Sequence, residues 1–329
     1  MRNILCVTLI ALLGGCTSTS VTEKYQDKRN DIINVKDKVI EFETGNVLIG
    51  SVSRLYMSNK CLLIADHKSV DKQIHIFNKN DFSYLTSIGN FGEGPEEITV
   101  MGCLAIDEAH HQLYVSDHAK QKIFSYDMDS VMVDSLYKPQ VKTAMNETLF
   151  PSEYQYINDT LSIAVLIKPT STSTFNQFLG RWNMNTGEMI PMKYTHPDIQ
   201  KKRITFAASE KAGIYVECYT RHDLMTICSL DGELLYNIYG PDWDGGNGNK
   251  LQSFGTVMIG NDKIFVSYCG EDYARDSFPT KILVFDLEGN YLKTLETGYK
   301  ISDCCYDSFN NRIILSLNDV VQFAYLDID

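Results

Sequence analysis

A short apolar segment that follows a turn signal recurs six times along the chain. The six segments begin at Leu62, Leu113, Leu161, Ile214, Ile264 and Ile313, so that consecutive ones lie 51, 48, 53, 50 and 49 residues apart. Periods of this length are typical of repeat architectures, in which each unit is one supersecondary element that packs against its neighbours. Six units at nearly constant spacing therefore indicate an assembly of similar units.

The order of segments inside each unit also recurs. A second apolar strand ends in Asn or Asp, as in 74–78, 123–127 and 282–286, and a hairpin signal such as Asp231-Gly232 follows it. Further strands precede and follow these segments, and 19 Tyr and 15 Phe against 8 Pro also favour strands. Four antiparallel strands in about fifty residues make one propeller blade. The sequence thus predicts an all-β fold, a six-bladed β-propeller with four antiparallel strands per blade.

The two ends of such a ring must meet, because an unpaired edge strand is open to aggregation. The sixth unit stops at Asp329, after its third strand, and so lacks an outer strand. Near the N-terminus, residues 38–43 alternate in polarity but belong to none of the six units. We therefore predict that this N-terminal strand completes and closes the last blade.

The first sixteen residues carry a targeting pattern. A ten-residue apolar run, Ile4 to Leu13, is too short to span a bilayer as a helix and has the length of a signal-peptide core. It ends in Leu13-Gly14-Gly15-Cys16, which resembles the lipobox of bacterial lipoproteins. The resemblance implies cleavage before Cys16 and lipidation of that residue. The lipid would anchor the N-terminus in a membrane, which is thus the expected partner of this segment. The alternative is an ordinary secretory signal in which Cys16 is incidental.

Three segments follow from these patterns. Residues 1–15 are expected to be the lipoprotein signal peptide, residues 16–34 a polar tether, and residues 35–329 the propeller. The segment after Cys16 has no dense acidic run of the kind that marks surface export in some lipoproteins. We therefore expect an outer-membrane lipoprotein of the cell envelope that faces the periplasm.

Charge and cysteine content limit the possible partners. The 30 Lys and Arg against 42 Asp and Glu leave a net charge of −12, which does not suit the phosphate backbone of a nucleic acid. Besides Cys6 and Cys16 the chain has seven cysteines, mostly in apolar runs and without zinc-ligand spacing. These are interpreted as buried free thiols, although a disulfide remains open in an oxidising compartment.

The junction between the first two units resembles a known family. The strand ends at Asp66 and Asp117, together with the Gly-rich segment 88–98, resemble the inter-blade signature of NHL-type propellers, with Glu96 and Ile98 as departures. With the lipobox, the chain resembles the six-bladed, TolB-like propeller lipoproteins that are common in Bacteroidetes. The resemblance implies a fold and an envelope location, and fold alone does not supply an activity.

The pairs Asp66-His67 and Asp117-His118 recur one unit apart. Two such pairs could hold a metal ion, but repetition in register favours aspartates that cap the same turn in successive blades. The loop 240–249 offers several oxygen ligands, yet its spacing fails the template of an EF-hand calcium loop. No metal site is therefore assigned.

Three residues remain as candidates for binding. Arg54 lies on a predicted innermost strand, where it could face the central channel and bind an anion. The predicted innermost strands contain few carboxylates, and Asp303 is an exception to this. Trp243 is either a stacking platform for a sugar or protein partner or a seal between blades. No recognisable catalytic motif occurs, so no catalytic residue is assigned.

These observations favour a lipid-anchored propeller that acts as a binding or scaffolding module for a protein or glycan ligand, with no cofactor. The alternative is an enzyme, a cation-dependent propeller hydrolase or lyase that acts on a lactone or a glycan at the channel mouth, with calcium as the candidate ion. Such sites draw Glu, Asn and Asp from several innermost strands, where this chain has few carboxylates. The sequence thus leans away from an enzyme without deciding the question.

Overall fold

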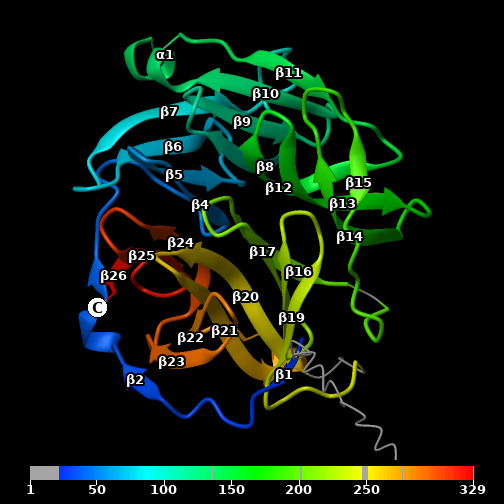
Figure 1. Cartoon of the computed structure of the whole chain (residues 1–329). Helices are drawn as coiled ribbons and strands as arrows, with labels where there is room; N and C mark the ends of the chain where they lie inside the picture. Colours follow the sequence, from blue (N-terminus) through cyan, green and yellow to red (C-terminus); the bar gives the residue numbers. More distant parts are fainter. Residues whose placement is uncertain (1–21, 135, 201, 247–250, 276, 329) are drawn as a thin grey trace, which may run out of the picture.

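The computed structural model describes residues 22–134, 136–200, 202–246, 251–275 and 277–328. These residues form six β-sheets arranged as blades around a central channel (Figure 1). Within these residues, helical structure is limited to α1 (Met128–Val133) and the short 3-10 turns Lys36–Lys38 and Tyr273–Arg275. The predicted fold, an all-β six-bladed propeller, is confirmed. No helix in the described part of the chain is long and apolar enough to cross a membrane.

Each blade has four antiparallel strands, which follow one another from the channel outward. The innermost strands are β4 (Ser53–Met57), β8 (Met101–Asp107), β12 (Phe150–Asn158), β16 (Ile204–Ser209), β20 (Leu251–Gly260) and β24 (Ile301–Asp307). The second strands are β5 (Cys61–Asp66), β9 (Gln112–Asp117), β13 (Leu161–Pro169), β17 (Ile214–Tyr219), β21 (Lys263–Asp272) and β25 (Arg312–Leu317). The third strands are β6 (Lys72–Asn78), β10 (Lys122–Asp127), β14 (Phe175–Trp182), β18 (Leu224–Ser229), β22 (Lys281–Asp286) and β26 (Phe323–Asp327). The outer strands are β7 (Tyr84–Asn90), β11 (Gln140–Ala144), β15 (Met189–Pro191), β19 (Leu234–Tyr239), β23 (Tyr291–Glu296) and, in the sixth blade, β3 (Ile40–Glu41).

The second strands are the repeated apolar segments of the sequence. All six residues of β5, β17 and β25 are buried, because both faces of a blade pack against neighbouring blades. Each of the six buried apolar clusters draws its residues from two adjacent blades. The seven described cysteines lie in this buried material as free thiols, as the sequence predicts.

The ring closes as predicted. Strand β3 pairs antiparallel with β26, with Ile40 opposite Tyr325 and Glu41 opposite Ala324. The next residue, Phe42, stacks on Phe82 of the first blade with ring centroids 3.8 Å apart. The N-terminal strand therefore joins the last blade to the first, although it is shorter than the expected segment 38–43.

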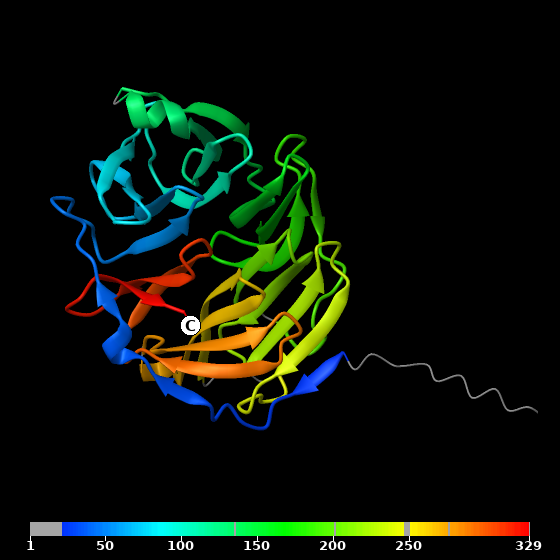
Figure 2. The same cartoon turned by 60° about the vertical axis from the view of Figure 1, so that its left-hand side comes forward.

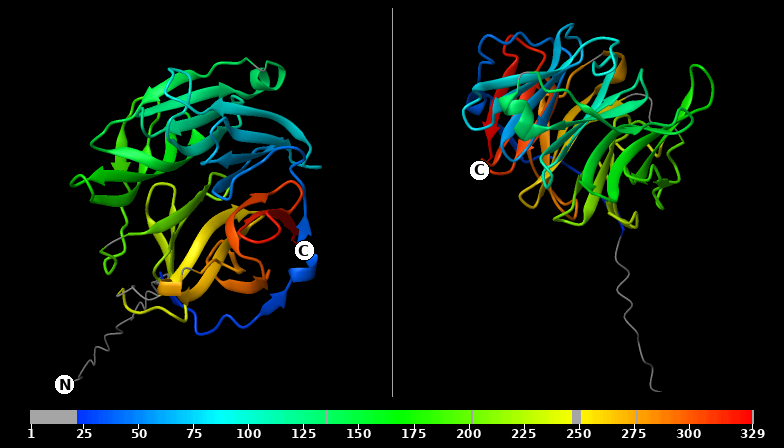
Figure 3. Two further views of the ribbon diagram at one scale, coloured as in Figure 1. Left: turned by 180° about the vertical axis from the view of Figure 1, so that it is seen from behind. Right: turned by 90° about the horizontal axis from the view of Figure 1, so that it is seen from above.

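The segment before β3 differs from the expected tether. Strand β1 (Glu23–Tyr25) adds a parallel fifth strand to the fourth blade through β19, and β2 (Ile32–Asn34) does the same for the fifth blade through β23. The chain from residue 22 to residue 43, which we call the N-terminal belt, thus runs along the outside of three successive blades (Figures 2 and 3). The polar composition of the belt made its strands hard to recognise in the sequence, because an outermost strand buries few of its side chains.

One residue of the belt is inserted deeply into the ring. The guanidinium of Arg29 lies 2.8 Å from the carboxylate of Asp223, and these side chains are 8% and 0% exposed. The same guanidinium lies 5.4 to 5.8 Å from the ring centroids of Phe254, Tyr268 and Phe285 in the fifth blade. Burial raises the pKa of Asp223, and the positive charge of Arg29 opposes that rise. Arg29 therefore fastens the belt between the fourth and fifth blades.

We predict that Arg29→Ala lowers the free energy of unfolding by about 3–5 kcal/mol, because it leaves a buried carboxylate without its charged partner. Urea denaturation of the two proteins measures this difference. Lys28→Ala is the matched control: Lys28 is the exposed neighbour in the belt, and its loss should change stability by less than about 0.5 kcal/mol. Equal stability of the two variants would contradict the assigned role of Arg29.

Candidate functional site

The innermost strands surround a cavity of about 1490 Å³. Residues from all six of these strands line it. Small-molecule sites usually measure about 300–1000 Å³, so this channel can accept a ligand of that size or a protruding part of a larger one. The channel is therefore a candidate ligand site.

Charged side chains gather toward one end of the channel. Neighbouring strands are antiparallel, so the beginning of each innermost strand lies beside the end of the second strand of its blade. Arg54 near the start of β4 forms a 2.9 Å ion pair with Glu153 of β12, and both side chains line the cavity. They are 46% and 39% exposed, so water or a ligand can reach the pair. The structure thus places Arg54 in the channel, as the sequence suggests, opposite an acid from another blade.

Asp303 lines the same cavity but is more firmly held. Its carboxylate accepts hydrogen bonds from the backbone N–H of Leu55, at 2.8 Å, and from the hydroxyl of Thr256, at 2.7 Å. These contacts join the sixth blade to the first and the fifth. Burial raises the pKa of Asp303, although the two donors and Arg54 oppose the rise. Asp303 therefore links three blades beside Arg54.

The repeated aspartates cap turns, which confirms the scaffolding interpretation of the Asp-His pairs. Asp66 accepts hydrogen bonds from the backbone N–H groups of Gly50 and Lys68, at 2.7 and 2.9 Å. Asp117 does the same for Thr99 and Ala119, at 2.8 and 3.0 Å. The two aspartates thereby tie the ends of β5 and β9 to the segments that lead into β4 and β8.

The histidines that follow these aspartates turn toward the channel. Both His67 and His118 line the cavity. The Nδ1 atom of His67 lies 3.2 Å from the carbonyl oxygen of Met101, and the buried Nε2 atoms of both rings have no hydrogen-bond partner among the described residues. A Cβ atom at Gly102 would lie 2.4 Å from Nε2 of His118, so only glycine leaves room for that ring.

The electrostatics of the channel mouth follow from this grouping. Burial lowers the pKa of both His67 and His118, and the charge of Arg54 lowers each further. For Arg54, desolvation would lower the pKa, but Glu153, Tyr56 and Asp303 together outweigh it and raise the pKa. The mouth at neutral pH therefore combines neutral imidazoles with a charged guanidinium–carboxylate pair.

Trp243 lies apart from this group. Its ring packs against those of Tyr239, His196 and His222, with centroids 5.0, 5.7 and 5.9 Å away. It is half-buried against the apolar cluster shared by the third and fourth blades. The contacts match the interpretation of Trp243 as a seal between blades, while the use of its exposed part as a stacking platform stays a prediction.

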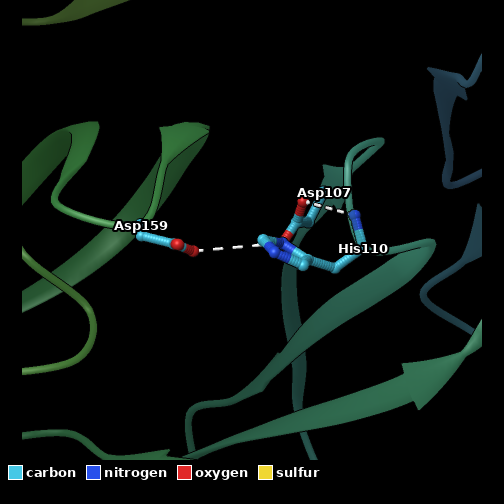
Figure 4. Close-up of side chains that lie close together, drawn as sticks. All are labelled: Asp107, His110 and Asp159. Carbon is cyan, nitrogen blue, oxygen red and sulfur yellow. Dashed lines mark hydrogen bonds and ion pairs between the residues drawn. The ribbon is translucent and has the colours of Figure 1, made fainter.

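A second cluster of titratable side chains lies at the opposite end of β8. Among the described residues, Asp107, His110 and Asp159 form a group whose ligand atoms lie within 4.8 Å of one another (Figure 4). His110 Nδ1 is 2.9 Å from Asp107 and 3.9 Å from Asp159. Asp107 is buried, whereas His110 and Asp159 are exposed. The group spans the turns of the second and third blades.

The same turn in the sixth blade explains the cluster. There Asp307 accepts a 2.7 Å hydrogen bond from the side-chain amide of Asn310, at the position that His110 occupies relative to Asp107. The backbone N–H of Asn310 and that of His110 also donate to their aspartates, at 3.3 and 3.1 Å. The turn thus forms with an amide as well as with an imidazole at this position, so the contact of His110 with Asp107 is explained as a structural hydrogen bond of the turn.

Sequence reasoning missed Glu153, although a signal for it exists. Arg54 and Glu153 are 99 residues apart, the same spacing as between Leu62 and Leu161 in the repeat. Equivalent positions two blades apart face each other across part of the channel. Counting the repeat forward from Arg54 would have found its partner, whereas no local motif marks Glu153.

The comparisons with known proteins agree with this architecture. Residues 17–177 match DUF5128, a family described as a six-bladed β-propeller. A search of curated proteins finds no significant match.

Three solved structures show the same fold at low sequence identity. A candidate exported protein of Bacteroides fragilis NCTC 9343 has a TM-score of 0.58 and 13% identity, over 89% of this chain and 87% of that one. A DUF4221 member from Bacteroides vulgatus ATCC 8482 has a TM-score of 0.57 and 11% identity, over 92% and 99%. The β-propeller domain of Cps50 (Swd1) from Myceliophteria thermophila has a TM-score of 0.54 and 9% identity, over 87% of this chain and 99% of that one. Identities this low establish similarity of fold alone.

We predict that His110 titrates above its ordinary pKa of 6.5, because its hydrogen bond to Asp107 and the charge of that residue raise the pKa. The stabilisation from the charged imidazole is complete below pH 6.5 and disappears as the pH rises through the raised pKa. NMR titration of the seven histidines measures the shift. His110→Asn, which copies the sixth-blade turn, should fold normally and lose this component of the pH dependence; an unshifted pKa would contradict the assigned contact.

A second NMR prediction concerns the channel mouth. Arg54→Gln should raise the pKa of both His67 and His118, because it removes a positive charge that disfavours their protonation. It should cost less than about 1 kcal/mol of stability, since the ion pair is half-exposed. Arg181→Gln removes a similarly exposed arginine, paired with Asp231 away from the channel, and should leave both histidines unchanged. A shift in the control and none in Arg54→Gln would refute the arrangement.

Proposed function

We propose that this chain is a lipid-anchored propeller of the cell envelope that acts as a binding or scaffolding module. The ligand, a protein or a glycan, enters the end of the channel where Arg54, Glu153 and Asp303 lie. The six-bladed fold and the size of the cavity support a binding role. The proposal includes neither a nucleic-acid partner nor a resident cofactor.

The envelope location is supported by two observations. The segment that ends in Cys16 resembles a lipobox, although Cys16 lies outside the described residues. The structurally similar Bacteroides fragilis protein is described as a candidate exported protein. The resemblance to TolB-like and NHL-type lipoproteins also fits a lipoprotein of the outer membrane that faces the periplasm. The anchor is the lipid on Cys16, which becomes the N-terminal residue once the signal peptide has been removed.

The observation that carries the binding proposal is the half-exposed ion pair of Arg54 and Glu153. In a purely structural ion pair, each charged group is usually satisfied by the other. The Arg54–Glu153 pair instead lies at a large cavity, and part of each group is accessible to solvent. The guanidinium offers donors in a planar fork and the carboxylate offers acceptors, so a ligand can meet both signs of charge at one place. Peptide and glycan groups both present such donors and acceptors.

We predict that a ligand found by screening peptide and glycan arrays binds about tenfold or more weakly to Arg54→Glu and to Glu153→Arg, because each variant places like charges together at the mouth. The double variant Arg54→Glu/Glu153→Arg restores the pair in reverse and should keep the fold. Binding is measured by calorimetry, with Arg181→Gln as the control. Undiminished binding by both single variants would place the site elsewhere, and turnover of a screened substrate would replace the binding role with catalysis.

The thermal midpoint should be the same with calcium and with a chelator, because the proposed site uses no resident cation. Calorimetric or fluorescence melting curves measure both midpoints. A ligand that binds only the folded state stabilises it by RT ln(1 + L/Kd), where L is the free ligand concentration, so the midpoint rises with the logarithm of that concentration once it exceeds Kd. A calcium-dependent rise would therefore favour the alternative, a cation-dependent hydrolase or lyase.

A further inference from the structure

The N-terminal belt shortens the expected connection between lipid and ring. Sequence alone suggests a tether that extends to residue 34, but strand β1 already pairs with the fourth blade at Glu23. Only seven residue steps separate Cys16 from Glu23, which allows a reach of at most about 25 Å when fully extended. A tether to residue 35 would reach more than twice as far. The anchor point on the ring is therefore fixed by β1.

The beginning of the belt is firmly attached. Tyr25 stacks on Tyr239 of the fourth blade with ring centroids 4.5 Å apart. The side-chain amide of Asn237 donates a 3.0 Å hydrogen bond to Glu23, and the hydroxyl of Tyr239 donates to the same carboxylate. With the buried Arg29–Asp223 pair further along, these contacts hold the first part of the belt against the ring. The seven-step connection from Cys16 to Glu23, which we call the leash, therefore ends at a strand that several contacts hold against the ring.

Although its composition is polar, the belt exposes four large apolar side chains. Tyr25, Ile32, Ile33 and Ile40 are 70%, 52%, 38% and 46% exposed. Apolar side chains exposed in a row often mark an interaction surface, and tyrosine in particular suits a boundary between an apolar and a wet phase. These four residues belong to β1, β2 and β3, which lie at the outer edge of the fourth, fifth and sixth blades (Figure 2).

Charge on the belt also permits contact with lipid. Residues 22–43 contain five Lys or Arg and six Asp or Glu, so the belt is nearly neutral within a chain of net charge −12. Anionic headgroups repel the acidic remainder of the molecule more strongly than they repel this edge. Apolar exposure, near-neutral charge and the short leash therefore coincide on one side of the ring.

We propose that the belt edge rests on the bilayer surface, with Tyr25, Ile32 and Ile33 of the fourth and fifth blades at the headgroup boundary. The inference rests on the proposed lipid anchor. A ring of this size is about 50 Å across by the usual scaling of compact domains, so when its belt edge rests on the bilayer the opposite edge lies well away from the membrane. The ring then stands on its rim, and the channel mouth remains open to ligands in solution.

Quenching by spin-labelled lipids tests this orientation in the full-length lipidated protein. The fluorophore NBD is attached to Lys28→Cys on the belt or, as the matched control, to Val133→Cys, which is 87% exposed on α1 of the second blade. The seven native thiols are buried, and burial raises the pKa of each of those seven cysteines, so they react slowly. The probes are vesicles of phosphatidylglycerol with excess phosphatidylethanolamine that carry the spin label near the headgroup.

Severalfold stronger quenching at position 28 than at position 133 is expected. Tyr25→Ser/Ile32→Ser/Ile33→Ser should reduce it, whereas Leu48→Ser/Val70→Ser/Val320→Ser, which changes even more exposed apolar residues outside the belt, should not. A folded-state control is the thermal midpoint of each variant. Equal or stronger quenching at position 133, or quenching at neither position in membrane-bound protein, would overturn the orientation.

Two further outcomes separate the orientation from its premise. Cys16→Ser should release the protein from membranes into the aqueous phase. If Cys16→Ser and the wild type partition alike in the aqueous phase, the lipid anchor fails, and the orientation fails with it. If instead Lys28→Cys forms disulfide-linked dimers on the vesicles, a second copy covers the belt edge, which overturns the lipid contact while the anchor stands.

Discussion

The whole structure depends on the face-to-face packing of neighbouring blades. Each apolar cluster is shared between two sheets, so no blade has a complete core of its own. Burial of apolar area contributes about 25 cal/mol per Å², and a blade at an open end would lose that contribution on one face. The ring must therefore close. Strand β3 provides the closure through its pairing with β26 and the stacking of Phe42 on Phe82.

Closure also explains why the N-terminus serves two purposes. The belt runs past the fourth and fifth blades before it completes the sixth, and Arg29 fixes it between two blades on the way. A chain that only closed the ring would need β3 alone. The added strands place the start of the folded body on the fourth blade, which gives any N-terminal anchor a defined position relative to the channel.

The channel mouth is a product of the same repetition. Asp66 and Asp117 hold equivalent turns in successive blades, and this brings His67 and His118 to the same end of the channel. Arg54 and Glu153 meet there because they occupy positions two repeats apart. The repeated geometry of the blades thus supplies the scaffold. The charged side chains at a few positions determine which groups the channel mouth offers to a ligand. Asp307 and Asn310 show how the scaffold accommodates different side chains at one turn.

The sequence by itself determined the number of blades, their four-stranded pattern and the closing strand, because hydrophobic periodicity and spacing are local properties that the fold must satisfy. It also indicated Arg54 as a channel residue. Only the tertiary structure decided that residues 22–34 form the belt, since their pairing partners β19 and β23 lie some 200 to 260 residues away and their exposed strands carry little apolar pattern. It likewise decided the pairing of Arg54 with Glu153 and the separation of Trp243 from the channel, because contacts between blades depend on strand register and twist, which no local segment encodes.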